Sequence, residues 1–233
     1  MRLDRFLSHA GFGTRKEVKS LLKEGRVYLN GHLIKTDGKN VDELSDTIEV
    51  DGQKVTYREF YYVLLNKPSG YVSSTLPERN YPPVTDLVPE YDFAHLFPAG
   101  RLDVDTTGVL LLTNNGPLAH RLISPKYHVD KTYLVTTDYP LQEEMISCFR
   151  DGVVLDGEKL LPAKLEILNP NKAKVTLHQG KYHQIKRMFA HYGLTVLSLD
   201  RLSFAFLNHE QLKLGEYRLL NEEEILRLED LTR

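Results

Sequence analysis

The chain has few of the features that mark secreted or membrane proteins. Its 233 residues include a single cysteine, Cys148, which excludes a disulfide framework and a zinc site built from four thiolates. No apolar run approaches the ~20 residues that a membrane-spanning helix requires. Polar Arg2, Asp4 and Arg5 follow Met1, so the apolar centre of a signal peptide is missing here. We therefore expect a cytoplasmic protein that does not contact a membrane.

Motifs for common cofactors and metals are also missing. The sequence contains neither the phosphate loop Gly-x-x-x-x-Gly-Lys-[Ser/Thr] nor the dinucleotide fingerprint Gly-x-Gly-x-x-Gly. His178, His183 and His191 do not have the spacing of a zinc-binding helix such as His-Glu-x-x-His. We expect no metal site and no cofactor.

Charge is nearly balanced over the whole chain but not along it. The formal net charge of −2 by itself argues against a nucleic-acid partner. Residues 2–35, however, carry eight basic and three acidic side chains, whereas residues 207–233 carry seven acidic and four basic ones. The acidic C-terminal segment therefore masks a basic N-terminal one.

A typical domain has ~100–200 residues, so the length predicts two domains, one of them small.

The N-terminal segment "GTRKEVKSLLKEGRVYLNGHLIK" predicts a helix followed by a hairpin. Thr14 and Glu17 form the sequence pattern of a capping box, and Gly25 stands where a helix C-cap is expected. Asn30-Gly31 is a strong signal for a two-residue hairpin turn. Basic side chains share one face of this helix: Lys16, Lys19 and Lys23, with Arg15 beside them. By itself, such a face is more often a solvated surface than a phosphate-binding one.

The pattern "SHAGFGTRKEVKSLLKEGRVYLNG" resembles the small RNA-binding domain shared with ribosomal protein S-four, over about residues 1–56. This resemblance implies an RNA-binding domain at residues 1–58. It also implies that this domain contacts the RNA backbone through Gly13, Arg15, Lys16, Lys19 and Arg26. We further expect Arg2 and Arg5 to bind RNA.

The rest of the chain predicts an α+β domain with a largely antiparallel sheet, because strand-like runs follow one another with few helices between them. These runs are "YYVLLN", "GVLLLTN", "KTYLVTTD", "AKLEIL", "AKVTLH" and "TVLSLDRLSF". Three helices are expected. In "PLQEEMISCFRDG", Pro140 would take the first helical position and Gly152 would follow the end. "HQIKRMFAHYG" would end at Gly193, and "NEEEILRLED" would begin with an Asn221–Glu224 capping box.

Two acidic residues, Asp103 and Asp105, lie in a turn of small residues ahead of the apolar run "GVLLLTN". Acidic side chains commonly stabilise such turns, and that role alone would explain them. The segment "DVDTT" also matches the aspartate-x-aspartate-x-threonine box of haloacid-dehalogenase phosphotransferases, in which the first aspartate attacks phosphorus while Mg²⁺ balances the charge. That box follows an apolar strand, whereas here the apolar run comes after it. The sequence also contains no later acidic pair to complete the metal site.

Four blocks resemble, in the same order, the rRNA pseudouridine synthases of the RsuA family. They are "LLNKPSGYVSS" (64–74), "GRLDVDTTGVLLLTNNG" (100–116), "KTYLV" (131–135) and "GKYHQIKRMFAHYG" (180–193). The last block reads "YHQIKRM" rather than the arginine-rich form typical of large-subunit relatives, which indicates the small-subunit branch. The resemblance spans the chain and implies a catalytic domain at residues 59–233.

The resemblance assigns four residues to the catalytic site. It makes Asp103 the nucleophile, which would attack ribose C1′ or uracil C6. A buried carboxylate stays ionised only beside a cation, and the resemblance assigns that cation to Lys186. Tyr133 would stack on the flipped uracil, and Arg101 would fill the space that the nucleotide leaves or hold a phosphate. From the residues alone, Lys186 could equally face phosphate, and a strand tyrosine could belong to the core.

Other residues of these blocks are expected to bind or support. His183 and Arg187 would contact RNA. Asp105 would stabilise the turn without taking part in the chemistry. The segment from Asn66 to Gly70 would form a turn that scaffolds the site.

The implied activity is the isomerisation of uridine to pseudouridine in ribosomal RNA, most directly small-subunit rRNA, by a monomer without a cofactor. Three alternatives remain at this point: a large-subunit rRNA pseudouridine synthase, the Mg²⁺-dependent phosphotransferase, and a non-catalytic ribosome assembly factor. The sequence specifies neither the modified nucleotide nor the base that removes the C5 proton. It also leaves open whether the substrate is free rRNA or a pre-ribosomal particle.

Overall fold

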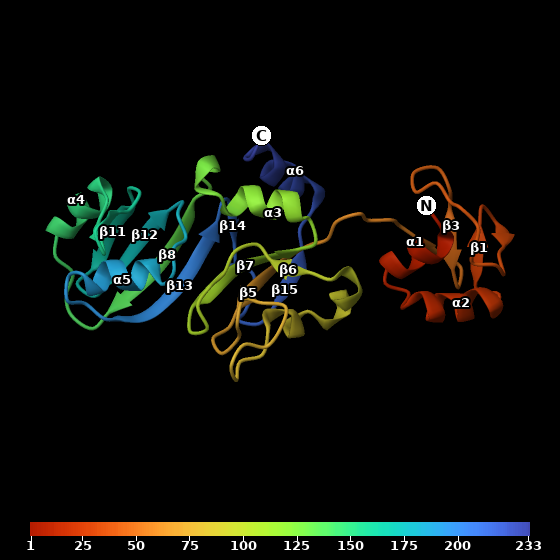
Figure 1. Cartoon of the computed structure of the whole chain (residues 1–233), viewed down its shortest axis with the longest axis horizontal. Coiled ribbons are helices and arrows are strands. Elements are labelled where there is room, and N and C mark those ends of the chain that lie inside the picture. The colour runs from red at the N-terminus through yellow and green to blue at the C-terminus, as the bar shows by residue number, and fades with distance from the viewer. The chain divides into compact units, whose positions relative to one another are not determined.

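The computed structural model of the chain describes residues 1–233. It divides into two compact units, Met1–Tyr61 with Pro89–Leu96 and Tyr62–Val88 with Phe97–Arg233 (Figure 1). The expected boundary between residues 58 and 59 stays a prediction. None of the helices has both the length and the apolar character needed to cross a membrane.

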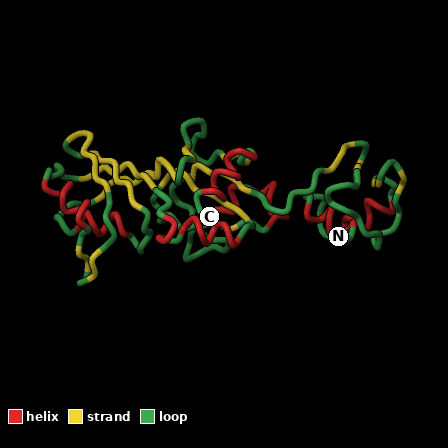
Figure 2. The backbone as a smooth tube through the Cα atoms, turned by 90° about the horizontal axis from the view of Figure 1, so that it is seen from above, coloured by secondary structure: helices red, strands yellow, loops and turns green.

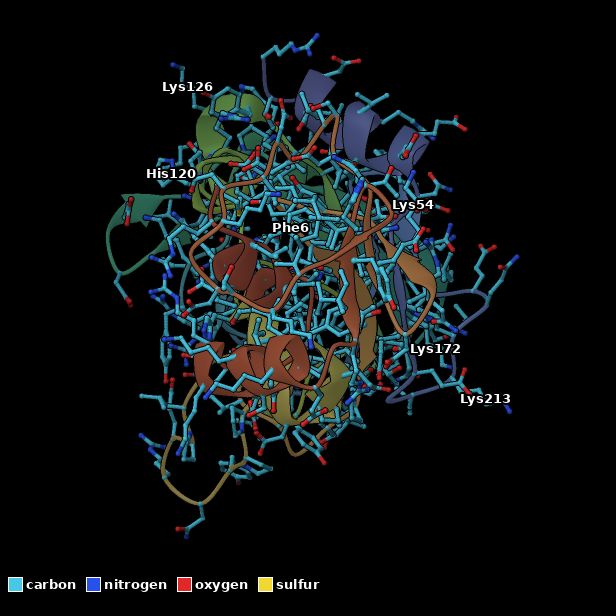
Figure 3. The ribbon with its side chains drawn as sticks, turned by 90° about the vertical axis from the view of Figure 1, so that its right-hand side faces the viewer. Phe6, Lys54, His120, Lys126, Lys172 and Lys213 are labelled. Atoms are coloured by element: carbon cyan, nitrogen blue, oxygen red, sulfur yellow. The ribbon has the colours of Figure 1, made fainter.

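The first unit contains two helices and a four-stranded antiparallel sheet. The helices are α1 (Leu3–His9) and α2 (Arg15–Lys23). The strands lie in the order β2-β1-β3-β4, with bounds β1 (Val27–Leu29), β2 (His32–Leu33), β3 (Ile48–Val50) and β4 (Gln53–Val55). Phe6 is 2% exposed in the core of this unit, whereas Lys54 points outward (Figure 3).

Local signals of the N-terminal segment are confirmed. Thr14 and Glu17 form the reciprocal hydrogen bonds of a capping box at the start of α2. Asn30 and Gly31 have φ angles of 51° and 76°, the left-handed values that a tight hairpin turn requires. Helix α1 is not anticipated from the sequence, because its N-cap residue Arg2 makes no side-chain capping bond.

The second unit is built on a nine-stranded sheet. Seven of the strands lie in the order β11-β12-β8-β13-β7-β5-β15, and the other two, β14 and β6, pair with β13 and β7. Its strands are β5 (Tyr62–Lys67), β6 (Phe97–Pro98), β7 (Thr107–Thr113), β8 (Lys131–Thr137), β11 (Lys164–Asn169), β12 (Lys172–Leu177), β13 (Val196–Phe204), β14 (Leu207–Asn208) and β15 (Tyr217–Leu219). A separate hairpin is formed by β9 (Val154–Leu155) and β10 (Glu158–Lys159). Only β13 and β7 pair in parallel, so the expected α+β fold is confirmed.

Helices cover this sheet in two groups. α3 (Gly116–Ile123) and α6 (Glu222–Asp230) bury apolar side chains against β5 and β7. α4 (Glu144–Asp151) and α5 (Gln184–Ala190) meet through Phe149 and Phe189, whose ring centroids are 5.4 Å apart. Figure 2 shows these two helices, in red, on one side of the strands. Two short 3-10 helices also belong to this unit, η1 (Val84–Leu87) and η3 (Pro125–Tyr127), whereas a third, η2 (Pro89–Ala94), belongs to the first unit.

The expected start of α4 is wrong. Pro140 lies outside the helix, which begins at Glu144. The N–H of Leu141 donates instead to the carbonyl of Pro170 at 2.6 Å, so this segment is tied to the turn between β11 and β12. The expected end is confirmed, since Gly152 follows the helix with a φ of 93°.

Strand β13 joins the two halves of the sheet. It pairs along its length with β8 but reaches β7 only through Asp200↔Thr107 and Arg201↔Gly108. Gly108 has a φ of 101°, and a Cβ atom there would lie 2.3 Å from the carbonyl oxygen of Arg201, so only glycine fits. Since β7 begins just after Asp103 and Asp105, this close pairing brings their turn next to β13, whose other edge pairs with β8.

Candidate active site

The turn that carries Asp103 is held from behind by a buried lysine. Lys67, at the end of β5, is 0% exposed. Its ammonium donates at 2.9–3.2 Å to four backbone carbonyls, those of Pro68, Asp103, Val104 and Thr106. Burial lowers the pKa of Lys67 to about 8. These bonds fix the backbone on either side of the carboxylate.

The loop after β5 holds the same turn from another side. The hydroxyl of Ser73 donates to the carbonyl of Leu102 and accepts from its N–H, both at 3.0 Å. The N–H of Gly70 donates to the carbonyl of Val104 at 2.9 Å. The block at residues 64–74 therefore packs directly against the backbone of the Asp103 turn.

Lys186, on α5, bridges the two aspartates of the turn. Its Nζ lies 3.0 Å from Asp103 Oδ2 and 2.6 Å from Asp105 Oδ1. The side chains of Asp103 and Lys186 are 26% and 25% exposed, whereas that of Asp105 is 70% exposed. Burial lowers the pKa of Lys186, but its hydrogen bonds to the two carboxylates outweigh that effect and raise it. Burial raises the pKa of Asp105, yet the Lys186 hydrogen bond holds it below its ordinary value.

A pocket lies beside this ion pair. The turn with Asp103, strand β8 and the loop leading into α5 all contribute to its lining. Tyr133 is 8% exposed and contributes an aromatic ring, while Leu102, Leu177 and Leu199 add apolar surface. A planar, partly apolar group could therefore enter between the ring of Tyr133 and the carboxylate of Asp103.

His183 and Arg187 also lie at this site. His183 Nε2 is 3.5 Å from Asp103 Oδ1, and the His183 ring stacks on the ring of Tyr182. Arg187 forms an ion pair with Asp156, in the turn between β9 and β10. Of the two predicted RNA-contacting residues, His183 therefore lines the pocket, whereas Arg187 is paired with Asp156 outside its lining.

Arg101 lines the pocket but does not contact the Asp103 carboxylate. Its guanidinium donates to both oxygens of Glu78, at 2.8 Å and 2.9 Å. The side chain is 63% exposed. Arg101 is therefore oriented by Glu78 toward solvent at the edge of the pocket.

The basic residues of the first unit separate into two sets. Arg2, Arg15, Lys16 and Lys19 line one cleft with the buried carboxylate of Asp4. Two of them also form ion pairs, Arg2 with Asp4 and Lys19 with Asp37. Outside this cleft, Arg5 is exposed on α1, and Arg26 forms ion pairs with Asp51 and Glu24.

Sequence reasoning missed two features of the site. Asp105 was expected only to stabilise the turn, whereas its carboxylate shares the ammonium of Lys186 with Asp103. Lys67 was expected to belong to a turn that supports the site, but its four hydrogen bonds to backbone carbonyls could not be predicted from the sequence. One signal was available for Lys67, namely a lysine at the end of a strand whose first four residues are Tyr, Val, Leu and Leu.

Comparisons with known proteins agree with this geometry. The family described as RNA pseudouridylate synthase matches residues 61–191, and the S4 domain family matches residues 1–48. A ribosomal small subunit pseudouridine synthase A of Vibrio cholerae is 41% identical over 97% of this chain and 98% of its own. A ribosomal large subunit pseudouridine synthase B of Bacillus subtilis is 38% identical over 99% and 96%. A crystal structure of a pseudouridylate synthase has a TM-score of 0.68 and 38% identity, and covers 98% of this chain and 99% of that one.

Proposed function

Because the chain belongs to the RNA pseudouridylate synthase family, we propose that it isomerises a uridine of small-subunit ribosomal RNA to pseudouridine. The observation that carries this proposal is the ion pair of Asp103 with Lys186 beside the pocket that contains Tyr133. The reaction breaks the N1–C1′ bond, forms a C5–C1′ bond, moves a proton to N1 and releases the proton from C5. It involves no net oxidation or reduction.

Asp103 is proposed as the nucleophile. Its carboxylate adds to ribose C1′ or to uracil C6, which divides one difficult step into two easier ones. Closing the pocket over a base removes water from the carboxylate, which is costly for a charged group that has no cation beside it. The ammonium of Lys186, 3.0 Å away, supplies that cation. Asp105 shares that ammonium from the exposed side and is proposed to help orient it.

Tyr133 is proposed as the platform for the flipped base. A uridine inside folded RNA is stacked, so the enzyme must extrude it at a cost of a few kcal/mol and hold it by new contacts. The nearly buried ring of Tyr133, together with the apolar side chains of the pocket, supports stacking on uracil. Arg101, at the edge of the same pocket, is suited to replace the flipped nucleotide or to hold a phosphate after leaving Glu78.

RNA outside the pocket is proposed to be held by basic side chains of both units. The cleft with Arg2, Arg15, Lys16 and Lys19 presents several cations to phosphates, and Arg5 and Arg26 extend this basic surface. His183, which lines the pocket, and Arg187, one helical turn further along α5, are proposed to contact RNA as well. With rRNA as its substrate, the protein would act as a monomer in the cytoplasm, where ribosomes are assembled.

Mapping pseudouridines in total rRNA from cells with and without this protein tests the proposal. We expect one or more small-subunit positions to lose the modification in the deletion and to regain it when the wild-type gene is restored. Loss of a large-subunit position instead would assign the chain to the other branch of the family. An unchanged map of both rRNAs would overturn the proposed function.

A further inference from the structure

Beside the pocket stands an aromatic side chain for which the reaction chemistry gives no role. Tyr182 lies in the loop that leads into α5, and its side chain is 76% exposed. Its ring stacks on that of His183, with centroids 3.9 Å apart and planes at 18°. His183 covers one face of the tyrosine ring, so the other face is open to solvent.

This pair of rings forms a short stack that starts at the nucleophile. His183 Nε2 lies 3.5 Å from Asp103 Oδ1, and Tyr182 is the next ring outward. The residues on either side of Tyr182, Lys181 and His183, line the pocket, whereas Tyr182 does not. The exposed face of Tyr182 is therefore positioned just outside the pocket mouth.

The loop that presents Tyr182 is held by contacts on both sides. The N–H of Lys181 donates to Gln184 Oε1 at 2.9 Å, and the ammonium of Lys181 forms an ion pair with Glu158 on β10. Arg187 donates to the carbonyl of Tyr182 at 3.5 Å and pairs with Asp156. A ring that is ordered before binding loses less conformational freedom when a partner stacks on it.

We infer that the exposed face of Tyr182 stacks on the base of a nucleotide next to the flipped uridine, and that Tyr182 thereby helps to hold the RNA in the flipped conformation. This inference rests on the proposed function. When uridine leaves the helix and enters the pocket, its neighbour along the strand remains at the mouth with one face uncovered. Aromatic side chains stack on any base, and unpaired bases of RNA are commonly recognised in this way. The ring of Tyr182 would stack on that uncovered face of the neighbouring base.

The test measures tritium release from small-subunit rRNA transcribed with uridine labelled at C5. Because base–aromatic stacking contributes to RNA binding, its loss in Tyr182→Ala should lower kcat/KM by roughly 5- to 100-fold. The kcat at saturating RNA should change by less than about threefold, because Tyr182 does not touch the reacting atoms. Tyr182→Phe keeps the ring and should stay within about twofold of wild type. Tyr182→Leu keeps the apolar volume without the ring and should resemble Tyr182→Ala.

Two further measurements complete the test. Tyr139→Ala is the matched control, since Tyr139 is 66% exposed and lies in a different loop. A 2-aminopurine base on either side of the target uridine should be quenched on binding wild-type protein and Tyr182→Phe but not Tyr182→Ala. Wild-type kcat/KM for Tyr182→Ala, or full activity of Tyr182→Leu, would overturn the inference while leaving the proposed function intact. A wild-type protein that releases no tritium would overturn the proposed function itself.

Discussion

The buried charge of Lys67 helps to fix the position of Asp103, the proposed nucleophile. Its ammonium bonds to four carbonyls, three of them in the turn that carries Asp103 and Asp105. Methionine has a similar length, so Lys67→Met should fill the space without making these bonds. Catalysis is sensitive to displacements of about 1 Å, which can cost roughly 100-fold in rate.

We therefore expect Lys67→Met to lower kcat by about 10- to 100-fold while RNA affinity changes little. Tritium release gives the rate, and filter binding gives the affinity. Lys54→Met, on an exposed strand of the first unit, is the control. An unchanged kcat in Lys67→Met would show that the turn holds its position without this lysine.

The same residue makes stability depend on pH in a defined direction. Folded Lys67 has a pKa of about 8, below the ordinary value of 10.5, because burial disfavours its charge. Between these two pH values the unfolded chain holds a proton that the folded chain has lost. The free energy of unfolding from this group therefore rises with pH from about 8 and levels off near 10.5. Lys131, with a pKa of about 8, contributes with the same sign.

Urea unfolding at about pH 7.5 and pH 9.5 measures this effect. Each of the two lysines should add on the order of 1–2 kcal/mol to the free energy of unfolding over that interval. Lys67→Met should lack the contribution of Lys67 and show a correspondingly smaller rise. Equal rises in the wild type and the variant would contradict the assignment to Lys67.

At the scale of elements, the site depends on the short parallel pairing of β7 with β13. Gly108→Ala would place Cβ 2.3 Å from the Arg201 carbonyl oxygen at a φ of 101°, so the strands must separate. Backbone strain and lost pairing should lower the free energy of unfolding by about 3 kcal/mol or more. Gly116→Ala is the matched control, because no atom lies within 4 Å of a Cβ at that position. Chemical denaturation should find Gly116→Ala close to wild type, and a similar value for Gly108→Ala would contradict this account.

Elements with strong local signals could be predicted from the sequence. The apolar run of β7, the alternating burial of β8 and the capping boxes of α2 and α6 all depend on neighbouring residues. The first helix could not be predicted, because it lacks a side-chain cap. The start of α4 was misplaced, because Leu141 bonds to Pro170, a partner far along the chain.

The candidate site was predictable in its parts but not in its arrangement. The resemblance named Asp103, Tyr133 and Lys186, and these residues lie around one pocket. The bond between Lys186 and Asp105 joins residues 81 positions apart and depends on how α5 packs beside the turn. Such a contact has no local pattern, so Asp105 was assigned to the turn alone.

At the scale of the whole molecule, the basic cleft of the first unit should govern how RNA binding depends on salt. Each phosphate contact steepens the dependence of log affinity on log salt by roughly 0.7 to 0.9. The triple variant Arg15→Ala, Lys16→Ala, Lys19→Ala should therefore bind rRNA with a slope that is shallower by about 2. A variant with three exposed lysines of the second unit changed to alanine removes the same charge: Lys126, Lys172 and Lys213. Equal slopes for the two triple variants would show that the cleft is only solvated surface.

The central claim is that the Asp103 carboxylate carries out the isomerisation. Asn preserves the size of the side chain but cannot act as the nucleophile, so Asp103→Asn isolates the chemistry from binding. Asp105→Asn, which removes the neighbouring charge on Lys186, is the matched control and should retain activity within about tenfold. The decisive measurement is tritium release from C5-labelled small-subunit rRNA by each variant, with RNA affinity measured in parallel. We predict no detectable release by Asp103→Asn at an affinity within about threefold of wild type, and substantial release by that variant would contradict the account.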